Sequence, residues 1–279
     1  MLVVQKLLKK PTLNASAYFT ARTMTAKRLH EKVAIVTAST EGIGFAIAKG
    51  LAENGAKVVV SSRKEEKVKL AVDNLNVAVP GNSGVSGVVC DAGREDHRKH
   101  LVDFTLEKHG KLDIVVLSAG TSGYYLGPML ETPESSWDQL FNINVKCGFL
   151  MAQLVAPHLR KTKGSMLFMG SVTGYSPFKD IGAYSVSKTA LLGLVKVLAA
   201  ELGPDGVRVN CIAPGFIKTN FSSTLTMGPA AEGILADTSL KRFGLSEECA
   251  GAAVFLSSDE ASYITGETVS INGGMPARL

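Results

Sequence analysis

The sequence contains few cysteines and no long apolar run. Its four cysteines include no C-x-x-C pair, which excludes a disulfide scaffold or a zinc knuckle and favours a reducing compartment. No stretch approaches the roughly 18 consecutive apolar residues that a membrane-spanning helix needs. With 46% apolar and 20% charged residues, most of the chain is expected to be ordered and globular. The cysteines are Cys90, Cys147, Cys211 and Cys249.

Acidic residues are missing from the first 30 positions, and this absence accounts for the net charge. Six of the 30 basic residues lie there, which leaves 24 basic and 25 acidic residues in the other 249 positions. The formal charge of +5 therefore belongs to the N-terminal segment. Because the rest of the chain lacks an excess of basic residues, no nucleic acid partner is expected. The six are Lys6, Lys9, Lys10, Arg22, Lys27 and Arg28.

The two ends of the chain are similar to targeting signals. Residues 1–30 are basic, acid-free and rich in Ser and Thr, as organellar transit peptides are. We interpret them as a targeting-like or disordered extension outside the fold, with Met24 as an alternative start. The C-terminal Ala277-Arg278-Leu279 has the small-basic-Leu form of a peroxisomal address. The prediction is therefore a peroxisomal protein, with the mitochondrion as the alternative.

Short apolar runs alternate with segments of helical periodicity from residue 31 onward. Runs such as KVAIV and DIVVL are continuously apolar, as in strands that helices cover on both faces. The alternation predicts an α/β fold with a Rossmann-type, doubly wound, seven-stranded parallel sheet in a single domain over 31–279. Strands are expected at 33–37, 57–61, 85–90, 114–117, 165–169, 207–213 and 268–272, and helices at 43–54, 65–76, 95–109, 136–159, 184–202 and 247–257.

One long irregular stretch, residues 216–242, follows the sixth predicted strand. Loops of this length in compact domains are usually functional, so we interpret it as a substrate lid; a plain surface excursion is the alternative. Aromatic and apolar residues gather in this segment and in neighbouring loops. They indicate either an apolar carbonyl substrate or local packing of the loops. They are Tyr124, Tyr125, Phe178, Phe216, Phe221, Leu225 and Met227.

A turn of small residues follows the first predicted strand and opens a helix. Glycines at this junction let the backbone approach a pyrophosphate, which then lies at the positive end of the helix. The context, strand then Gly-x-Gly then helix, is the one that a dinucleotide-binding motif requires. The residues expected to bind cofactor here are Ala38, Ser39, Thr40, Gly42, Ile43 and Gly44.

Cations replace the usual acid after the second predicted strand. Sheets that bind NAD place a carboxylate there for the ribose 2′-hydroxyl, whereas this chain has Ser62, Arg63 and Lys64. A guanidinium can bind a 2′-phosphate through paired hydrogen bonds, so NADP(H) is the expected cofactor; a solvated basic turn is the alternative. Asp91, after the third strand, is expected to accept from the adenine amino group, or else to cap a helix.

Tyr184 and Lys188 lie four residues apart on a predicted helix, and Ser171 ends the fifth strand. Spacing of i and i+4 puts the two side chains on one helical face. An ammonium near a phenol lowers its pKa, which at about 10 is otherwise too high for ready proton exchange at neutral pH. We therefore expect Tyr184 to exchange a proton with a carbonyl oxygen and Ser171 to hydrogen-bond the same oxygen.

Six groups of these candidate residues follow six different predicted strands, so they share the carboxyl edge of the sheet, where ligands bind in open α/β folds. The groups are Gly42-Gly44, Ser62-Arg63, Asp91, Ser118-Ala119-Gly120, Ser171 and Pro214-Gly215. Together with Asn144 in N-x-N-V, they resemble the motifs of the short-chain dehydrogenase/reductase superfamily over residues 32–279. The resemblance implies that Lys188 holds the nicotinamide ribose, that Asn144 positions a water behind Lys188, and that Thr219 contacts the carboxamide. It also implies cofactor contacts from Ser118, Ala119, Gly120, Tyr184, Lys188, Pro214, Gly215, Ile217 and Thr219.

Within this superfamily, segments such as VTASTEGIGFAIA and VVVSSRK are similar to those of peroxisomal NADPH-dependent carbonyl and retinal reductases. The resemblance implies reduction of aromatic ketones, α-dicarbonyls or retinal-like aldehydes, and a homotetramer. Two departures from the wider superfamily are Ala38, where glycine is usual, and Ser118, where N-A-G has asparagine.

Two other functions stay open: an NAD-linked alcohol or steroid dehydrogenase, and a non-catalytic NADP(H)-sensing interaction protein. No metal is expected, because the histidines lack acidic or cysteine partners at ligand spacing.

Overall fold

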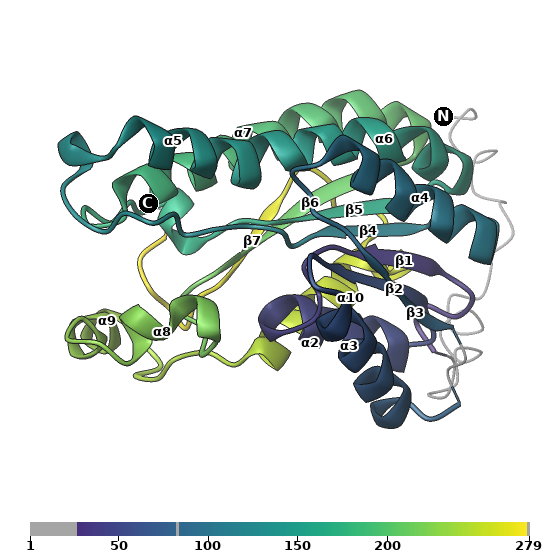
Figure 1. Ribbon diagram of the computed structural model, residues 1–279, viewed down its shortest axis with the longest axis horizontal. Coiled ribbons are helices and arrows are strands. Elements are labelled where there is room, and N and C mark those ends of the chain that lie inside the picture. The colour runs from purple at the N-terminus through teal and green to yellow at the C-terminus, as the bar shows by residue number, and fades with distance from the viewer. Residues whose placement is uncertain (1–26, 82–83, 278–279) are drawn as a thin grey trace, which may run out of the picture.

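The computed structural model describes residues 27–81 and 84–277. Its centre is one parallel sheet in the order β3-β2-β1-β4-β5-β6-β7 (Figure 1). The Rossmann-type fold with seven strands is therefore confirmed. Most of the predicted extension, 1–26, and the last two residues of the predicted C-terminal address lie outside the described residues. The strands are β1 (Val33–Val36), β2 (Lys57–Ser62), β3 (Val85–Val89), β4 (Ile114–Leu117), β5 (Ser165–Met169), β6 (Arg208–Pro214) and β7 (Thr268–Ile271).

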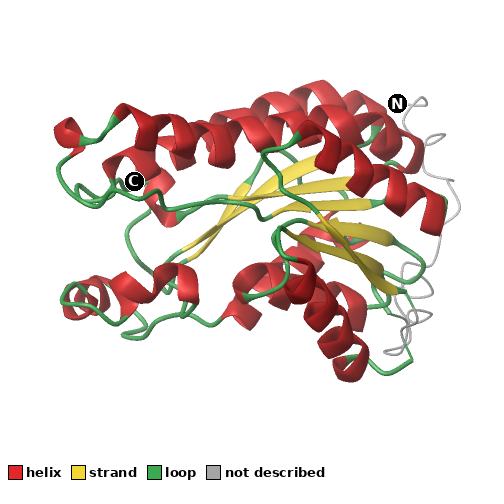
Figure 2. Ribbon diagram, viewed as in Figure 1, coloured by secondary structure: helices red, strands yellow, loops and turns green. Residues whose placement is uncertain are grey.

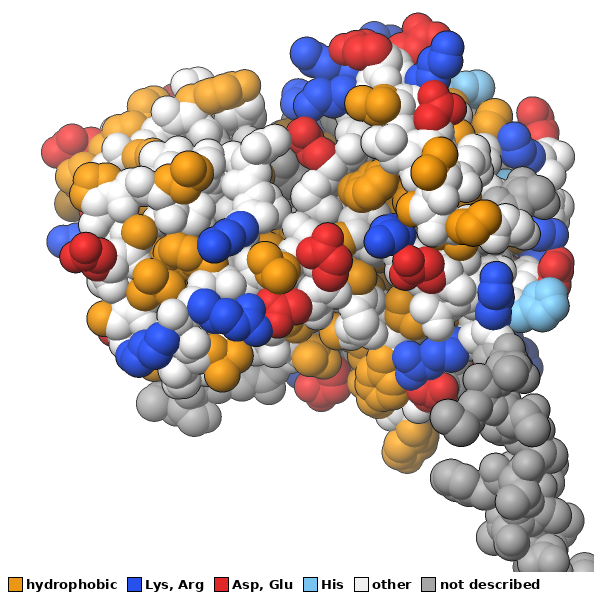
Figure 3. All heavy atoms as spheres, turned by 90° about the horizontal axis from the view of Figure 1, so that it is seen from below, with side chains coloured by type: hydrophobic (Ala, Val, Ile, Leu, Met, Phe, Trp, Pro, Cys, Tyr) orange, Lys and Arg blue, Asp and Glu red, His pale blue; other side chains and the backbone are white. Residues whose placement is uncertain are grey.

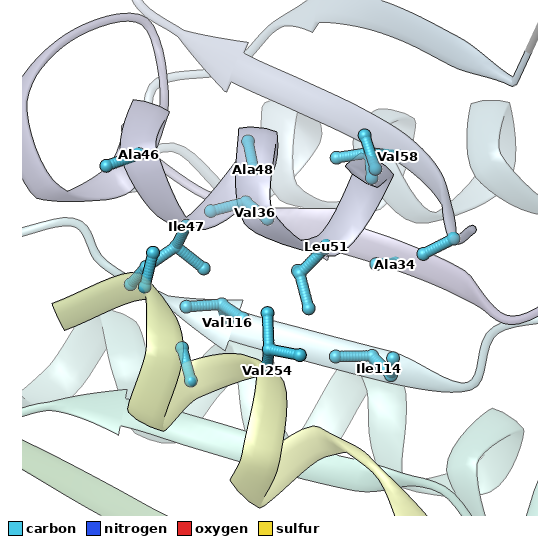
Figure 4. Packing of buried hydrophobic residues seen from close by; sticks show 14 of the residues in the cluster. Ala34, Val36, Ala46, Ile47, Ala48, Leu51, Val58, Ile114, Val116 and Val254 are labelled. Carbon is cyan, nitrogen blue, oxygen red and sulfur yellow. The ribbon is translucent and has the colours of Figure 1, made fainter. Parts of the chain in front are cut away.

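Helices cover both faces of the sheet (Figure 2). One buried cluster joins the sheet to α2 (Gly42–Glu53), α3 (Glu65–Ala78) and α10 (Ser246–Ser257). Figure 4 shows its centre, where Ile47 and Leu51 of α2 lie over the strands and beside Val254 of α10. The second cluster joins the opposite face to α4 (Glu95–His109), α6 (Cys147–Thr162) and α7 (Gly182–Leu202). Burial on both faces explains why the strands are continuously apolar.

The helix predicted at 136–159 is confirmed as a helical segment, but a π turn divides it into two α-helices. Helix α5 (Glu134–Phe141) ends in a π-helical turn, Asn142–Lys146, from which α6 continues. A π turn adds one residue to a helical turn, so the apolar pattern on its two sides is out of phase by about 100° even though the chain stays helical.

The segment 216–242 is more regular than the sequence predicted. It contains the short helices α8 (Ser223–Thr226) and α9 (Ala231–Asp237) and has a small buried cluster of its own, in which Ile234 and Phe243 pack with Val172 and Met275. Ring centroids of Phe178 and Phe216 lie 5.5 Å apart against this cluster.

The C-terminal segment, residues 272–277, is hydrogen-bonded to the end of the 216–242 segment. The Leu240 amide donates to the Gly273 carbonyl at 3.0 Å, and the Ser239 hydroxyl donates to the Gly274 carbonyl at 2.9 Å. Gly273 and Gly274 have φ values of 64° and 82°, which glycine adopts without strain. Met275 thereby enters the same cluster as Ile234.

All four cysteines are buried and free. Burial raises the pKa of the Cys90 and Cys211 thiols to about 11 and that of Cys249 to about 12. The pKa of Cys147 is also raised, mainly by burial. These thiols are therefore protonated and weakly reactive at neutral pH.

The surface carries charges of both signs. On the face seen from below, Lys and Arg side chains are interspersed with Asp, Glu and hydrophobic side chains (Figure 3). Within the described ranges, every helix is too short or too polar to cross a membrane.

Candidate active site

The turn after β1 is held in a conformation that suits glycine. Gly42 has a φ of 59°, and Ala38 has a φ of 49°, a left-handed conformation that costs a non-glycine residue free energy. A Cβ added to Gly44 would lie 2.4 Å from the Ala38 carbonyl oxygen, so the turn tolerates no side chain there. The first turn of α2 contains no acidic residue and no side-chain cap. Its amide N–H groups are therefore available to an anion.

Two hydroxyls beneath this turn connect neighbouring loops. The Thr37 hydroxyl accepts from the amides of Ser118 at 3.0 Å and Ala119 at 3.2 Å. The Ser39 hydroxyl donates to the Val36 carbonyl at 2.6 Å and accepts from the Ser61 amide at 3.0 Å. Ser39, predicted as a cofactor ligand, is fully buried in this structure, and its amide donates to the Ser61 carbonyl at 3.0 Å. Sequence reasoning missed Thr37, which holds the loop where Ser118 replaces the usual asparagine.

The cations predicted to select the cofactor lie at the surface after β2. Arg63 and Lys64 are exposed, and neither forms an ion pair within the ranges that the structure describes. Ser62, at the strand end, is half-buried. Thr40 and Ile43 lie on the glycine turn and are also half-buried, Ile43 against the core. The glycine cradle and the uncapped α2 terminus thus fit the phosphates of a dinucleotide.

Asp91 stabilises a turn in this structure. Its Oδ1 accepts from the Gly93 amide at 2.9 Å, and α4 begins at Glu95 with Arg94 as its N-cap residue. The alternative interpretation of Asp91 as the helix cap is therefore wrong. His97 Nδ1 accepts from the Asp91 amide at 3.1 Å. Among the described residues, no group of three or more His, Cys, Asp or Glu side chains is placed to hold a metal ion.

Ser171, Tyr184 and Lys188 come together at the carboxyl end of β5. The Ser171 hydroxyl accepts from the Thr173 amide and hydroxyl at 3.2 and 3.0 Å, which fixes its position. The Lys188 ammonium donates to the Met169 carbonyl at 2.8 Å and lies 5.6 Å from the centroid of the Tyr184 ring. The spacing of four residues thus puts the Tyr184 and Lys188 side chains on one face of α7, toward the end of β5 where Met169 and Ser171 lie.

Burial dominates the proton affinities of this cluster. It raises the pKa of Tyr184 to about 12, and a hydrogen bond with the Ser171 side chain opposes part of that rise. Burial also lowers the pKa of Lys188 to about 8. The expected lowering of the Tyr184 pKa by Lys188 is therefore not found, because removing both groups from water disfavours phenolate and ammonium alike. At neutral pH the phenol keeps its proton.

Asn144 lies in the π turn and reaches two other elements. Its Oδ1 accepts from the Thr121 amide at 2.8 Å, while Nδ2 donates to the Thr121 carbonyl and to the Ser187 hydroxyl, both at 3.0 Å. A Cβ added to Gly120 would lie 3.4 Å from Asn144 Oδ1 and 3.5 Å from Lys188 Nζ. The loop after β4, the π turn and α7 therefore meet at one point.

The loop after β6 closes the other side of the glycine turn. A Cβ added to Gly42 would lie 3.4 Å from Thr219 Cγ2, so the two predicted cofactor segments face each other. Pro214 ends β6 and is buried, and the Gly215 amide donates to the Ile271 carbonyl at 2.9 Å. The Ile217 side chain is buried in the main core, so its predicted cofactor contact is limited to the backbone.

Only some of the predicted substrate residues lie next to Tyr184. The Phe221 ring is 6.2 Å from the Tyr184 ring between centroids, and Tyr125 lines a small hollow beside Tyr184, together with Ser122, Thr132 and Ile181. Phe178, Phe216 and Leu225 instead pack against the small cluster of the 216–242 segment. Tyr124 and Met227 are 87% and 84% exposed.

Comparisons with known proteins agree on one family. A family profile described as enoyl-(acyl carrier protein) reductase matches residues 37–276. "Dehydrogenase/reductase SDR family member 4" from Bos taurus is 48% identical over 90% of this chain and 89% of its own length. "Tropinone reductase-like 3" from Erythroxylum coca is 48% identical over 93% of this chain and 99% of its own length.

Solved structures agree as well. A 7α-hydroxysteroid dehydrogenase complexed with NADH and 7-oxo glycochenodeoxycholic acid superposes with a TM-score of 0.84 at 34% identity, covering 91% of this chain and 98% of its own. Levodione reductase gives a TM-score of 0.84 at 29% identity, covering 88% of this chain and 98% of its own.

Proposed function

The chain belongs to the short-chain dehydrogenase/reductase family of oxidoreductases, whose members use nicotinamide cofactors, and from this premise we propose that it is an NADPH-dependent carbonyl reductase. The observation that carries the proposal is the meeting of Ser171, Tyr184 and Lys188 at the carboxyl end of β5. The proposed substrates are aromatic ketones, α-dicarbonyls and retinal-like aldehydes, all of which present a carbonyl on an apolar body.

NADPH, when bound, supplies the hydride for the carbonyl carbon. Tyr184 donates a proton to the carbonyl oxygen, a role that needs the protonated phenol which its raised pKa maintains. Ser171 donates a hydrogen bond to the same oxygen as negative charge develops there. Lys188, whose ammonium lies 5.6 Å from the centroid of the Tyr184 ring, is proposed to hold the nicotinamide ribose, and Asn144 holds the loop after β4 against α7.

The loop of residues 118–120 and the turn of residues 38–44 are the proposed cofactor site, with Thr219 closing it. The segment 216–242 is proposed as the substrate lid, because it places Phe221 beside Tyr184.

The test is reductant consumption by the purified protein with NADPH and NADH in parallel. An α-dicarbonyl, an aromatic ketone and all-trans-retinal serve as substrates. Turnover with NADPH and little with NADH supports the proposal. Tyr184→Phe is expected to abolish turnover while NADPH still binds, because it removes only the proton donor, and Tyr263→Phe at the exposed surface is the control. Retained activity in Tyr184→Phe would refute the assignment.

Cofactor preference is tested separately at Arg63. Because its guanidinium is exposed and free to pair with a 2′-phosphate, Arg63→Ala is expected to raise the KM for NADPH about tenfold and to leave the KM for NADH unchanged. Lys69→Ala, also exposed and on α3, is the matched control. Equal efficiency with the two cofactors in the wild type would favour the alternative, an NAD-linked alcohol or steroid dehydrogenase, which the likeness to a hydroxysteroid dehydrogenase supports.

The proposal also covers the cellular location and the oligomeric state of the protein. We propose a peroxisomal homotetramer whose address is Ala277-Arg278-Leu279, with the mitochondrion as the alternative address through residues 1–30. When the protein carries a fluorescent tag at its N-terminal end, deletion of Leu279 is expected to abolish peroxisomal import in cells. Unchanged import would contradict the C-terminal address.

A further inference from the structure

Ser187 lies between Tyr184 and Lys188 in the sequence, yet the proposed mechanism does not use it. It is fully buried on α7. Its hydroxyl donates to the Tyr184 carbonyl at 2.7 Å and accepts from Asn144 Nδ2 at 3.0 Å. One hydroxyl therefore connects the first turn of α7 to the π turn between α5 and α6.

The connection continues beyond Asn144. The same side chain exchanges two hydrogen bonds with the backbone of Thr121, in the loop after β4. The chain of contacts runs from this loop through the π turn to the helical turn that carries Tyr184 and Lys188. Because all three polar contacts of Asn144 are internal, its side-chain amide is committed to this connection.

We propose that Ser187 is a positioning residue, whose hydroxyl sets the rotation and distance of the Tyr184–Lys188 turn relative to the loop after β4. The inference rests on the proposed function for its consequence in catalysis. A residue three positions from Tyr184 lies on the flank of the same helical face, so a contact there resists rotation of the turn about the axis of α7. Such a rotation would move the Tyr184 phenol and the Lys188 ammonium together.

A hydroxyl is the group that this position requires. It must donate to a helix carbonyl and accept from an amide at once, which serine and threonine can do. Alanine would leave an N–H of the buried Asn144 unsatisfied, so the π turn and α7 would be free to separate. The connection also gives the π turn a physical role, because the added residue places Asn144 where it meets α7.

The experiment compares Ser187→Ala, Ser187→Thr and a matched control, Ser185→Ala. Ser185 is equally buried on α7, and its hydroxyl also makes two hydrogen bonds, to the Ile181 carbonyl and from the Phe178 amide. Ser187→Ala is expected to lower kcat about tenfold or more, with the KM for the carbonyl and the Kd for NADPH within about twofold. Ser187→Thr is expected to restore kcat to within about threefold. Ser185→Ala is expected to melt at a lower temperature without this loss of kcat.

A readout without cofactor or substrate accompanies the kinetics. The ionisation of Tyr184 is followed by ultraviolet absorbance at alkaline pH, as the difference between each variant and the same variant carrying Tyr184→Phe. Ser187→Ala is expected to move the pKa of Tyr184 from about 12 downward, because a loosened turn exposes the phenol to water. Ser187→Thr and Ser185→Ala are expected to leave it in place.

The outcomes separate this proposal from the proposed function. Wild-type kcat and wild-type Tyr184 ionisation in Ser187→Ala would overturn the positioning role. A parallel loss of NADPH binding and kcat would also overturn it, since that pattern belongs to general damage. If no carbonyl is reduced even by the wild type, the proposed function fails, and the ionisation measurement alone then decides whether Ser187 positions Tyr184.

Discussion

Ala38 adopts a left-handed conformation, with φ at 49°, that its Cβ disfavours. Glycine would adopt it without that penalty, although it would also gain conformational freedom in the unfolded chain. We expect Ala38→Gly to raise the free energy of unfolding by about 0.5 to 1 kcal/mol, measured by urea denaturation. Ala46→Gly, inside α2 where the backbone is helical, is expected to lower it by about 1 kcal/mol. Destabilisation by both changes would show that the Ala38 methyl group makes a necessary contact.

Burial of Lys188 is expected to make the free energy of unfolding increase as the pH rises. With a folded pKa of about 8 against about 10.4 in the unfolded chain, the folded state binds fewer protons between these values. Raising the pH through this window therefore relieves the cost of the buried ammonium and favours the folded state. Relative to Lys188→Met, the wild type is expected to gain on the order of 2 kcal/mol of unfolding free energy between about pH 7 and about pH 10.

The measurement is urea unfolding of the two proteins across that range. Most other titrating groups are common to both and cancel in the difference, whereas the Cys211 thiol, whose pKa burial raises to about 11 although Lys188 opposes part of the rise, titrates mainly above this range. A difference that does not change with pH would mean that Lys188 is not charged at neutral pH or is hydrated when folded.

Among single residues, the sequence predicted those that a regular spacing or a position at a strand end identifies. Tyr184 and Lys188 were found because a helix converts four residues of separation into one face, and Ser171 because strand ends share an edge. Thr37 and Ser187 were missed, since a hydroxyl that joins two loops leaves no periodic pattern. The raised pKa of Tyr184 was missed because it depends on burial, which residue spacing does not reveal.

Among the elements, the π turn shows where helical periodicity misleads. Both sides of it are helical and apolar on one face, so a continuous helix over 136–159 fits the pattern, and only the added residue at Asn142–Lys146 breaks the phase. The central strands β1 and β4 were predicted almost to the residue because burial on both faces makes them continuously apolar. The short helices α8 and α9 were missed because their few turns are stabilised by the cluster around Ile234.

The C-terminal segment is expected to control the order of the 216–242 segment. Met275 is buried with Ile234 and Phe243, so Met275→Ala should remove about 2 kcal/mol or more of local packing. We expect faster proteolysis near Gly228-Pro229 and a KM increase of about threefold or more for retinal. The KM for a small α-dicarbonyl, which needs less of this segment, should change little.

Val77→Ala, on an exposed site of α3, is the control for this comparison. Unchanged proteolysis in Met275→Ala would show that the hydrogen bonds of Ser239 and Leu240 hold the segment without the methionine.

At the scale of the whole molecule, the strand order explains why distant sequence motifs meet. Parallel strands put the loops after β1, β2, β4, β5 and β6 at one edge of the sheet, and the sequence predicted this from the alternation of strands and helices alone. Which loops touch was not predictable, because it depends on loop conformation. The contact of Thr219 with Gly42 is an example.

Assembly is a prediction at this scale. We expect helices α6 and α7 to form a subunit contact, and they expose Phe149 by 40% and Val197 by 64%. The sedimentation mass is expected to be about four times the 29.4 kDa of one chain. Phe149→Glu with Val197→Glu is expected to lower it, since charges are costly in an apolar contact, whereas Val77→Glu on α3 should not. A wild-type mass near that of one chain would refute the tetramer.

The burial of all four cysteines makes the chain suited to site-directed spin labelling. With every native thiol enclosed and held protonated at neutral pH, maleimide or methanethiosulfonate reagents should find almost no background sites. Tyr124→Cys and Met227→Cys would place two labels at exposed positions, the second of them in the 216–242 segment. The distance distribution between them, recorded with and without NADPH, would report directly on movement of the 216–242 segment.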